Sequence, residues 1–338
     1  MKKTKKKARK VSSRSSSKRG AKKKAGKLWE FKDFLSMKEI CREELDVLFK
    51  LADKMKKSPE SFYGKLKGRS LVMLFQKPSM RTRISFEVGI QQMGGCAVYM
   101  PPQEHPLGER ESLKDIARAL SRYCDAAVIR TYAHSDIEDF ARTASIPVIN
   151  GLSDSYHPCQ TLADLFTIRE KFRALEKINI AYIGDGNNVL SSLLYGVAKV
   201  GANLAIALPR GYEPSEEILK DIKILSKESG ARISLSNNPF TAIKNAHAIY
   251  TDVWVSMGQE KQREQRVRDF QPFQVNSAIL SKAPKDSIVM HCLPAHRGEE
   301  ITDEVIEHPR SAIFDQAENR LHTQKALLYL LLTVKRKR

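Results

Sequence analysis

The chain has 338 residues, a length at which one hydrophobic core usually divides, so we expect two domains of about 150 residues each. A formal net charge of +19 suggests nucleic acid or an anionic surface as partner, but the charge is unevenly placed. Residues 1–28 hold 14 of the 58 Lys and Arg residues and no acid, which leaves 44 basic against 39 acidic residues elsewhere. The net of +5 makes the remaining chain only mildly basic.

The basic segment 1–28 consists of like charges, Ser, Gly and Ala, with almost no apolar side chain. It cannot offset its ordering entropy by burial, so we expect a disordered tail. A contact with nucleic acid or acidic lipid, an organelle address and a purely solubilising extension remain alternatives, of which the last is favoured. An organellar transit peptide would be Arg-rich and amphipathic, and Lys dominates here, which favours the cytoplasm over the mitochondrial matrix.

The apolar runs and the cysteines exclude two further classes of protein. No apolar run reaches the ~20 residues of a membrane span, so we expect a soluble protein without a membrane partner. The five cysteines are scattered and never form a CxxC pair, which predicts neither a disulfide framework nor a structural zinc site. A reducing compartment fits best.

From residue 34 onward, short aliphatic runs alternate with segments of helical periodicity, the pattern of parallel sheets with helices on both faces. The fold class is therefore α/β, with two doubly wound parallel-sheet domains around a cleft. Expected strands cover 70–75, 126–130, 178–184, 202–208, 246–251 and 287–291, and expected helices 37–57, 158–177 and 316–334.

Domain boundaries follow from these elements. A helix with a charged end, followed at residue 178 by a new strand, places a boundary near residue 170. The last helix is apolar through LYLLL and must pack on something, so we expect it to return to the first domain. The predicted division is a tail at 1–28, a first domain at 29–170 completed by helix 318–338, and a second domain at 171–317.

The segment KPSMRTRISFEVG follows the first strand and opens a helix near Met80. Free backbone N–H groups and the positive end of a helix dipole form an anion site, so Ser79, Arg81 and Thr82 are expected phosphate ligands. Arg83 is either a second ligand or a surface ion-pair partner. The alternative for Ser79 is a helix cap without a ligand.

Three further polar side chains follow the next strands. Arg130 ends a predicted parallel strand, where α/β folds collect ligand groups, although a solvated strand-end charge is equally compatible with its position. His157 and Gln160 lie about one turn apart at a helix start. A His is often structural, but this pair suits a carbonyl oxygen and an amide NH2.

The second half of the chain has three strand-end segments. GDGNNV resembles a dinucleotide fingerprint, but Val189 replaces its third glycine, so a bound polar small molecule near Asn187 and Asn188 is favoured. Asp252, Ser256 and Cys292 follow the last two strands. Taken alone, a free cysteine such as Cys292 is more often buried and inert.

Together the strings SMRTR, HPCQ, DVWVSMGQE and HCLPAHRG resemble the ornithine carbamoyltransferase family in order and spacing, over about residues 30 to 330. The resemblance implies carbamoyl phosphate and L-ornithine as substrates, citrulline and phosphate as products, a role in arginine biosynthesis or the urea cycle, and a homotrimer or a multiple of trimers. It implies neither a metal nor an organic cofactor, because the phosphate leaving group already carries the activation.

The resemblance also assigns residues. It gives catalytic roles to Arg130, His157, Asp252 and Cys292. Carbamoyl phosphate would contact Ser79, Met80 through its backbone, Arg81, Thr82, Arg130, His157, Gln160, Cys292, Leu293 and Arg320, and ornithine would contact Asn188, Asp252, Ser256 and Met257. One position departs from the family: Pro106 stands where a His or Gln usually reaches into a neighbouring subunit, and His105 is the candidate substitute.

Overall fold

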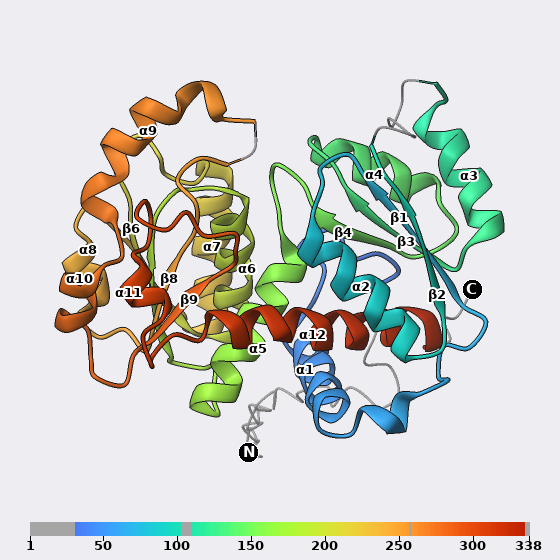
Figure 1. Ribbon diagram of the computed structural model, residues 1–338, viewed down its shortest axis with the longest axis horizontal. Coiled ribbons are helices and arrows are strands. Elements are labelled where there is room, and N and C mark those ends of the chain that lie inside the picture. The colour runs from blue at the N-terminus through green and yellow to red at the C-terminus, as the bar shows by residue number, and fades with distance from the viewer. Residues whose placement is uncertain (1–30, 103–109, 257, 335–338) are drawn as a thin grey trace, which may run out of the picture.

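The computed structural model describes residues 31–102, 110–256 and 258–334. The predictions for the basic tail, for His105 and Pro106, and for Met257 therefore lie outside the described residues. The described chain forms two lobes side by side, each built on a parallel sheet with helices on both faces (Figure 1). This architecture confirms the predicted α/β fold with two parallel-sheet domains.

The first lobe contains a four-stranded parallel sheet in the order β2-β1-β3-β4. The chain moves from β1 to β2 on one side and then returns to β3 on the other, so a crevice opens between the carboxyl ends of β1 and β3. The elements are α1 (Arg42–Lys57), η1 (Pro59–Phe62), β1 (Ser70–Phe75), α2 (Met80–Gln92), β2 (Cys96–Met100), α3 (Leu113–Tyr123), β3 (Ala126–Arg130), α4 (His134–Thr143), β4 (Val148–Leu152) and α5 (Pro158–Phe172).

The second lobe contains a five-stranded parallel sheet in the order β7-β6-β5-β8-β9, with its crevice between β5 and β8. Its elements are β5 (Asn179–Ile183), α6 (Asn188–Val200), β6 (Asn203–Ala207), α7 (Glu216–Ser229), β7 (Ile233–Ser236), α8 (Pro239–Ile243), β8 (Ala248–Thr251), η2 (Glu260–Gln262), α9 (Arg263–Phe270), η3 (Gln271–Phe273), α10 (Ser277–Lys282), β9 (Ile288–His291) and α11 (Asp303–Ile306).

The last helix, α12 (Ile313–Thr333), leaves the second lobe and crosses to the first, where it packs against α1, α2 and α5 (Figure 1). Its apolar residues enter the largest hydrophobic core, which contains side chains of both lobes. Close packing of α5 on α6 also joins the lobes, because a Cβ at Gly196 would lie 2.6 Å from Thr161 Cγ2. The cleft between the lobes is therefore framed by shared helices.

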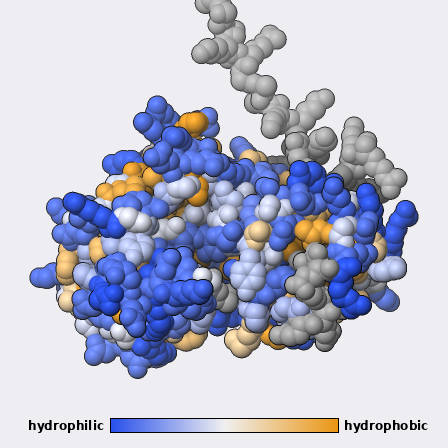
Figure 2. All heavy atoms as spheres, turned by 90° about the horizontal axis from the view of Figure 1, so that it is seen from above, coloured by the Kyte–Doolittle hydropathy of each residue, from blue (hydrophilic) through white to orange (hydrophobic). Residues whose placement is uncertain are grey.

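Among the described residues, no helix has the length and apolar character needed to cross a bilayer. On the face drawn in Figure 2, hydrophilic residues predominate and apolar residues form only small groups.

Several predicted boundaries were wrong for local reasons. The helix expected from residue 37 begins at Arg42, because the Cys41 N–H donates to Glu44 Oε2 at 2.8 Å and starts the helix there. The helix expected to reach residue 177 ends at Phe172, where Arg173 adopts a φ of 59°. The predicted domain division after residue 170 lies in the last turn of α5 and stays a prediction. The final helix begins at Ile313, three residues before the predicted start.

Strands β2, β4 and β7 were not among the predicted ranges, and all three lie at sheet edges. β2 and β7 are partly exposed, so their sequences lack the continuous apolar runs that mark β1 and β3. β4 is mostly buried, but Asn150 and Gly151 interrupt its apolar run. The four predicted strands of the second lobe are present but shorter than predicted. β5 and β6 each lack one residue at both ends. β9 begins one residue late and β8 two residues late.

Candidate active site

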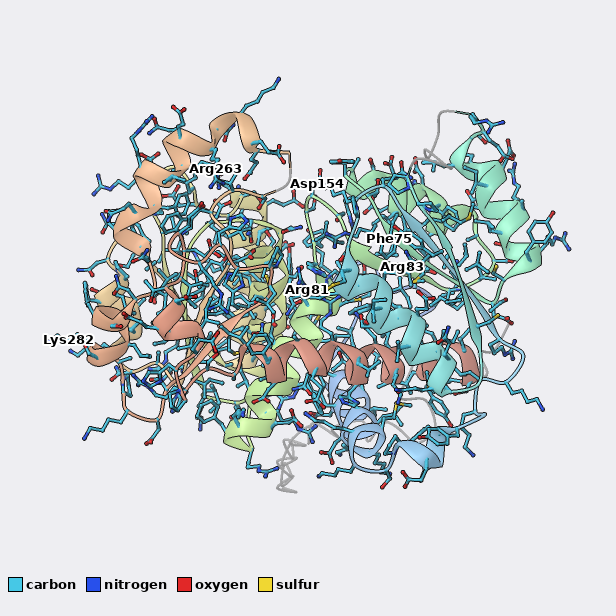
Figure 3. All side chains as sticks on the ribbon, viewed as in Figure 1. Phe75, Arg81, Arg83, Asp154, Arg263 and Lys282 are labelled. Atoms are coloured by element: carbon cyan, nitrogen blue, oxygen red, sulfur yellow. The ribbon has the colours of Figure 1, made fainter. Side chains whose placement is uncertain are left out.

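A cleft of about 1020 Å³ lies where the carboxyl ends of the two sheets face each other. Figure 3 places Arg81 at its first-lobe wall, at the start of α2. Twelve of the predicted site residues line this cleft: Ser79, Met80, Arg81, Thr82, Arg130, His157, Asn188, Asp252, Ser256, Cys292, Leu293 and Arg320. Gln160 lies behind the wall.

The start of α2 forms the first-lobe wall. Ser79 is the N-cap, and its hydroxyl accepts a hydrogen bond from the Thr82 N–H at 3.2 Å. The capping role is thus present, and Ser79 also faces the cleft. The helix start directs unpaired N–H groups and positive dipole charge at the same space. Arg83 is instead directed away and pairs with Glu87 at 3.3 Å.

Three arginines from distant parts of the chain meet beside this helix start. Arg130, at the end of β3, donates from Nε to the Lys77 carbonyl at 3.2 Å, and Arg320, on α12, donates from Nη2 to Thr82 Oγ1 at 3.3 Å. Burial, together with repulsion from Arg320 and Arg81, lowers the pKa of Arg130 to about 9. The mutual repulsion of the three guanidinium groups favours binding of an anion between them.

His157 and Gln160 stand at the start of α5, but only the histidine faces the cleft. Burial, with Arg320 and Arg130 nearby, holds the pKa of His157 well below its usual value, so its ring is neutral at pH 7. Gln160 is 1% exposed, and its Oε1 accepts a hydrogen bond from Arg320 Nη1 at 2.7 Å. A neutral ring and a fixed amide provide oriented polar groups beside the arginines.

The second-lobe wall is centred on Asp252, which follows β8. One carboxylate oxygen accepts from Asn187 Nδ2 at 2.7 Å, and the other accepts from the Cys292 thiol at 2.8 Å. Strand register explains the second contact, because Thr251 is paired with His291 and the next residues are therefore adjacent. Burial and the Asp252 charge hold the pKa of Cys292 well above its usual value, so this group is a thiol at neutral pH.

The remaining predicted residues complete this wall. Asn188 Nδ2 donates to the Ser153 carbonyl of the first lobe at 2.6 Å. The Ser256 N–H donates to Gln259 Oε1 at 3.1 Å. Leu293 has a φ of 57°, and its N–H donates to His291 Nδ1 at 2.8 Å, which fixes the turn that carries Cys292.

The sequence-based reasoning missed a buried ion pair in the cleft wall between Arg266 of α9 and Asp185 after β5. Arg266 also donates to the Trp254 carbonyl at 2.6 Å, and its guanidinium lies 4.8 Å from the Tyr212 ring centroid. Lys77 was also missed: it is 4% exposed and lies 4.2 Å from the Tyr132 ring centroid. Its place directly after a buried strand was the available signal.

Two clusters in the described residues have the residue types of a metal site. Asp252, His291 and Cys292 form one, and His296, Glu299 and Glu300 form the other, each with ligand atoms within 4.8 Å. In the first cluster these groups already form hydrogen bonds. The Cys292 thiol donates to Asp252, and the His291 ring is hydrogen-bonded to Glu300 and to the Leu293 N–H. Catalysis without a metal or cofactor stays a prediction.

Fold and cleft together define a two-domain α/β enzyme whose first lobe attracts an anion and whose second lobe presents a carboxylate, a thiol and amides. Two family profiles match the chain: "Aspartate/ornithine carbamoyltransferase, carbamoyl-P binding domain" over residues 32–170, and "Asp/Orn binding domain" of the same family over residues 176–331. The chain belongs to the aspartate/ornithine carbamoyltransferase family.

Individual relatives agree with this assignment. Ornithine carbamoyltransferases of Anoxybacillus flavithermus and Thermococcus kodakarensis are each 50% identical over 303 residues, which cover 89% of this chain and 96% of each relative. The solved structure of ornithine carbamoyltransferase from Pyrococcus furiosus is 47% identical, with a TM-score of 0.88 over 90% of this chain and 99% of that one. These similarities extend over both lobes and the cleft.

Proposed function

We propose that this carbamoyltransferase transfers the carbamoyl group of carbamoyl phosphate to the side-chain amine of L-ornithine, giving L-citrulline and phosphate. The observation that carries the proposal is that the two walls of one cleft differ in chemistry. Arg81, Arg130 and Arg320 lie on the first wall, and Asp252 and Cys292 lie on the second. The first set suits a phosphate, and the second suits an amino acid. The relatives named above support ornithine as the acceptor.

For carbamoyl phosphate, the start of α2 and the arginines bind the phosphate oxygens. Ser79, the Met80 N–H, Arg81 and Thr82 surround the phosphate, and Arg320 closes its far side. Arg130 and His157 lie against the carbamoyl carbonyl oxygen, and Gln160 Oε1 accepts from the carbamoyl NH2. Negative charge that grows on the carbonyl oxygen during attack meets positive charge and N–H donors fixed beforehand.

For ornithine, Asn188 and the Ser256–Met257 segment bind the α-carboxylate, and Asp252 binds the α-ammonium. Cys292 and the Leu293 carbonyl then face the side-chain amine. Making that amine neutral near pH 7.4 costs roughly three pKa units, or ~4 kcal/mol. Partial desolvation in the closed cleft disfavours the charged ammonium and so offsets part of this cost. Because Cys292 is a thiol that already donates to Asp252, the carboxylate rather than the sulfur is the local proton acceptor.

A citrulline assay with a panel of amines tests the proposal. Carbamoyl phosphate is supplied with L-ornithine, putrescine, acetylated ornithine or L-aspartate, and carbamoylated products are quantified. We expect the largest kcat/KM with L-ornithine. A preference for putrescine, which lacks the α-amino and carboxylate groups, would overturn the assignment of the second wall.

The pH dependence follows from the protonation states. Only the neutral amine of ornithine attacks, so kcat/KM for ornithine should rise about tenfold from pH 7 to 8, below the amine pKa of about 10. The rise should flatten toward pH 9, because Arg130, with a pKa of about 9, begins to lose its charge there. His157 is already neutral at pH 7 and Cys292 still protonated at pH 9, so neither adds an inflection. A plateau reached below pH 8 in a kcat/KM profile would contradict these assignments.

Replacing Cys292 by alanine removes the thiol that donates to Asp252 at 2.8 Å. We expect KM for ornithine to rise and kcat to fall, by about tenfold each, because a hydrogen bond to a charged group contributes about 1.5–3 kcal/mol. Cys292→Ser keeps a donor and should recover part of the loss. Cys124→Ala, outside the cleft, is the matched control, and equal effects of both alanine variants would exclude a role for Cys292.

The proposal includes a homotrimer or a multiple of trimers, a cytoplasmic location, and a role in arginine biosynthesis or in the urea cycle. The family resemblance of the SMRTR and HCLP segments supports the assembly and the metabolic role. The Lys-dominated segment 1–28, which does not fit a transit peptide, favours the cytoplasm. Sedimentation of the full chain measures the assembly. Deleting residues 1–28 and comparing citrulline formation separates the catalyst from any contact of the basic segment with nucleic acid.

A further inference from the structure

A buried chain of hydrogen bonds connects the two walls of the cleft through Asp164 on α5. Gln160 Nε2 donates to Asp164 Oδ1 at 2.8 Å, and Gln316 Nε2 of α12 donates to the same oxygen at 2.6 Å. All three side chains are at most 1% exposed. At the first wall, Gln160 Oε1 accepts a hydrogen bond from Arg320 Nη1. At the second wall, Gln316 Oε1 accepts from the His291 N–H at 2.9 Å. Asp164 itself does not line the cleft.

Asp164 decides which way the Gln160 amide is turned. A carboxamide has one donor end and one acceptor end, and a carboxylate oxygen accepts only. With Nε2 held at Asp164, Oε1 is turned toward Arg320, on the side of the anion site. The reversed amide would set two acceptors together at Asp164 and two donors together at Arg320, and each unsatisfied buried group costs about 1–3 kcal/mol.

We infer that Asp164 is a positioning residue that sets the selectivity of the site for carbamoyl phosphate over acyl phosphates. The inference rests on the proposed function, in which Gln160 Oε1 accepts from the carbamoyl NH2. Acetyl phosphate has a methyl group in place of that NH2 and gains nothing from the acceptor. The phosphate and the carbonyl oxygen are shared by both compounds and contact other residues. Loss of Asp164 therefore weakens the binding of carbamoyl phosphate but not that of acetyl phosphate.

The surroundings of Asp164 predict which substitution preserves its role. Burial raises the pKa of Asp164 to about 7, while the donors Gln160 and Gln316 lower it. The nearby buried Tyr250 hydroxyl lowers this pKa as well. Asparagine keeps an acceptor oxygen for the two glutamines and directs an NH2 group toward that hydroxyl, so it retains the orientation of Gln160. Alanine does not.

The experiment compares two constants in the full-length protein: KM for carbamoyl phosphate, and Ki of acetyl phosphate as its competitor. For Asp164→Ala we expect the KM to rise about tenfold, the loss of one oriented hydrogen bond, and the Ki to change less than about threefold. For Asp164→Asn both constants should stay within about threefold of the wild type. If Asp164→Ala is not recovered folded, Asp164→Ser replaces it with the same expectation. The serine hydroxyl is too short to reach the place where Asp164 Oδ1 accepts from Gln160.

Thr167→Val is the matched control. Thr167 lies one turn further along α5, is fully buried, and accepts from Asn319 Nδ2 of α12 at 2.9 Å, so its loss also removes a buried hydrogen bond between these helices. We expect both constants to be unchanged in this variant.

Two results would overturn the inference: KM and Ki rising together in Asp164→Ala, or Asp164→Asn as impaired as Asp164→Ala. Failure of the proposed function is separate, because it would appear in the wild type as no citrulline formed from carbamoyl phosphate.

Discussion

Replacing Arg81 by alanine is expected to lower kcat/KM for carbamoyl phosphate by about 10³-fold, because it removes a charged donor from the site of the leaving phosphate. Arg81 lines the cleft at the start of α2, where partial burial disfavours its charge and lowers its pKa (Figure 3). A dianion restores the lost solvation and accepts from the planar guanidinium at two points. Initial rates at varied carbamoyl phosphate, with ornithine saturating, measure the effect.

Two further variants decide whether charge or geometry is responsible. Arg81→Lys keeps the charge without the forked donor and should recover part of the activity. Arg83→Ala, two residues along the same helix, removes an arginine that pairs with Glu87 outside the cleft and should change kcat/KM less than about threefold. Near-normal kinetics in Arg81→Ala, or equal losses at both positions, would refute the phosphate assignment.

The strand ends explain why much of the cleft was predictable from sequence. In a parallel sheet all carboxyl ends lie at one edge, so a polar residue directly after a buried apolar run is placed at the ligand-binding edge whatever the distance along the chain. Arg130, Asp252 and Cys292 each have this position, and all three line the cleft. The helix start at Met80 was predictable for a similar reason, because Ser79 is a strong N-cap residue.

What sequence could not provide is the orientation of side chains set by remote partners. The Gln160 amide is turned by Asp164 and by Arg320, a residue 160 positions away. The spacing of His157 and Gln160 could therefore suggest a shared ligand but not the orientation of the amide. The ion pair of Arg266 with Asp185 joins residues 81 positions apart. Asp185 follows β5 within the GDGNNV segment, but nothing in the local sequence indicates that its partner is Arg266.

Replacing Asp252 by asparagine should have its large effect on the other substrate. The two carboxylate oxygens accept from Asn187 and Cys292, so an asparagine must place its NH2 against one of these donors, and the negative charge facing the α-ammonium of ornithine is lost. We expect kcat/KM for ornithine to fall about 10²–10³-fold, while KM for carbamoyl phosphate changes less than about threefold. Initial rates with each substrate varied in turn separate the two constants.

Asp154→Asn is the control, because Asp154 is exposed and faces the same cleft from the first lobe (Figure 3). Its carboxylate accepts from the His134 N–H and the Ser155 hydroxyl, not from the donors of Asp252. It should leave both constants within about threefold of the wild type. The expected effects of the two variants are thus opposite. Arg81→Ala lowers kcat/KM for carbamoyl phosphate, and Asp252→Asn lowers kcat/KM for ornithine. A fall in the apparent affinity for both substrates in Asp252→Asn would mean that the walls are coupled through this carboxylate, and that the division of the cleft into two separate half-sites is wrong.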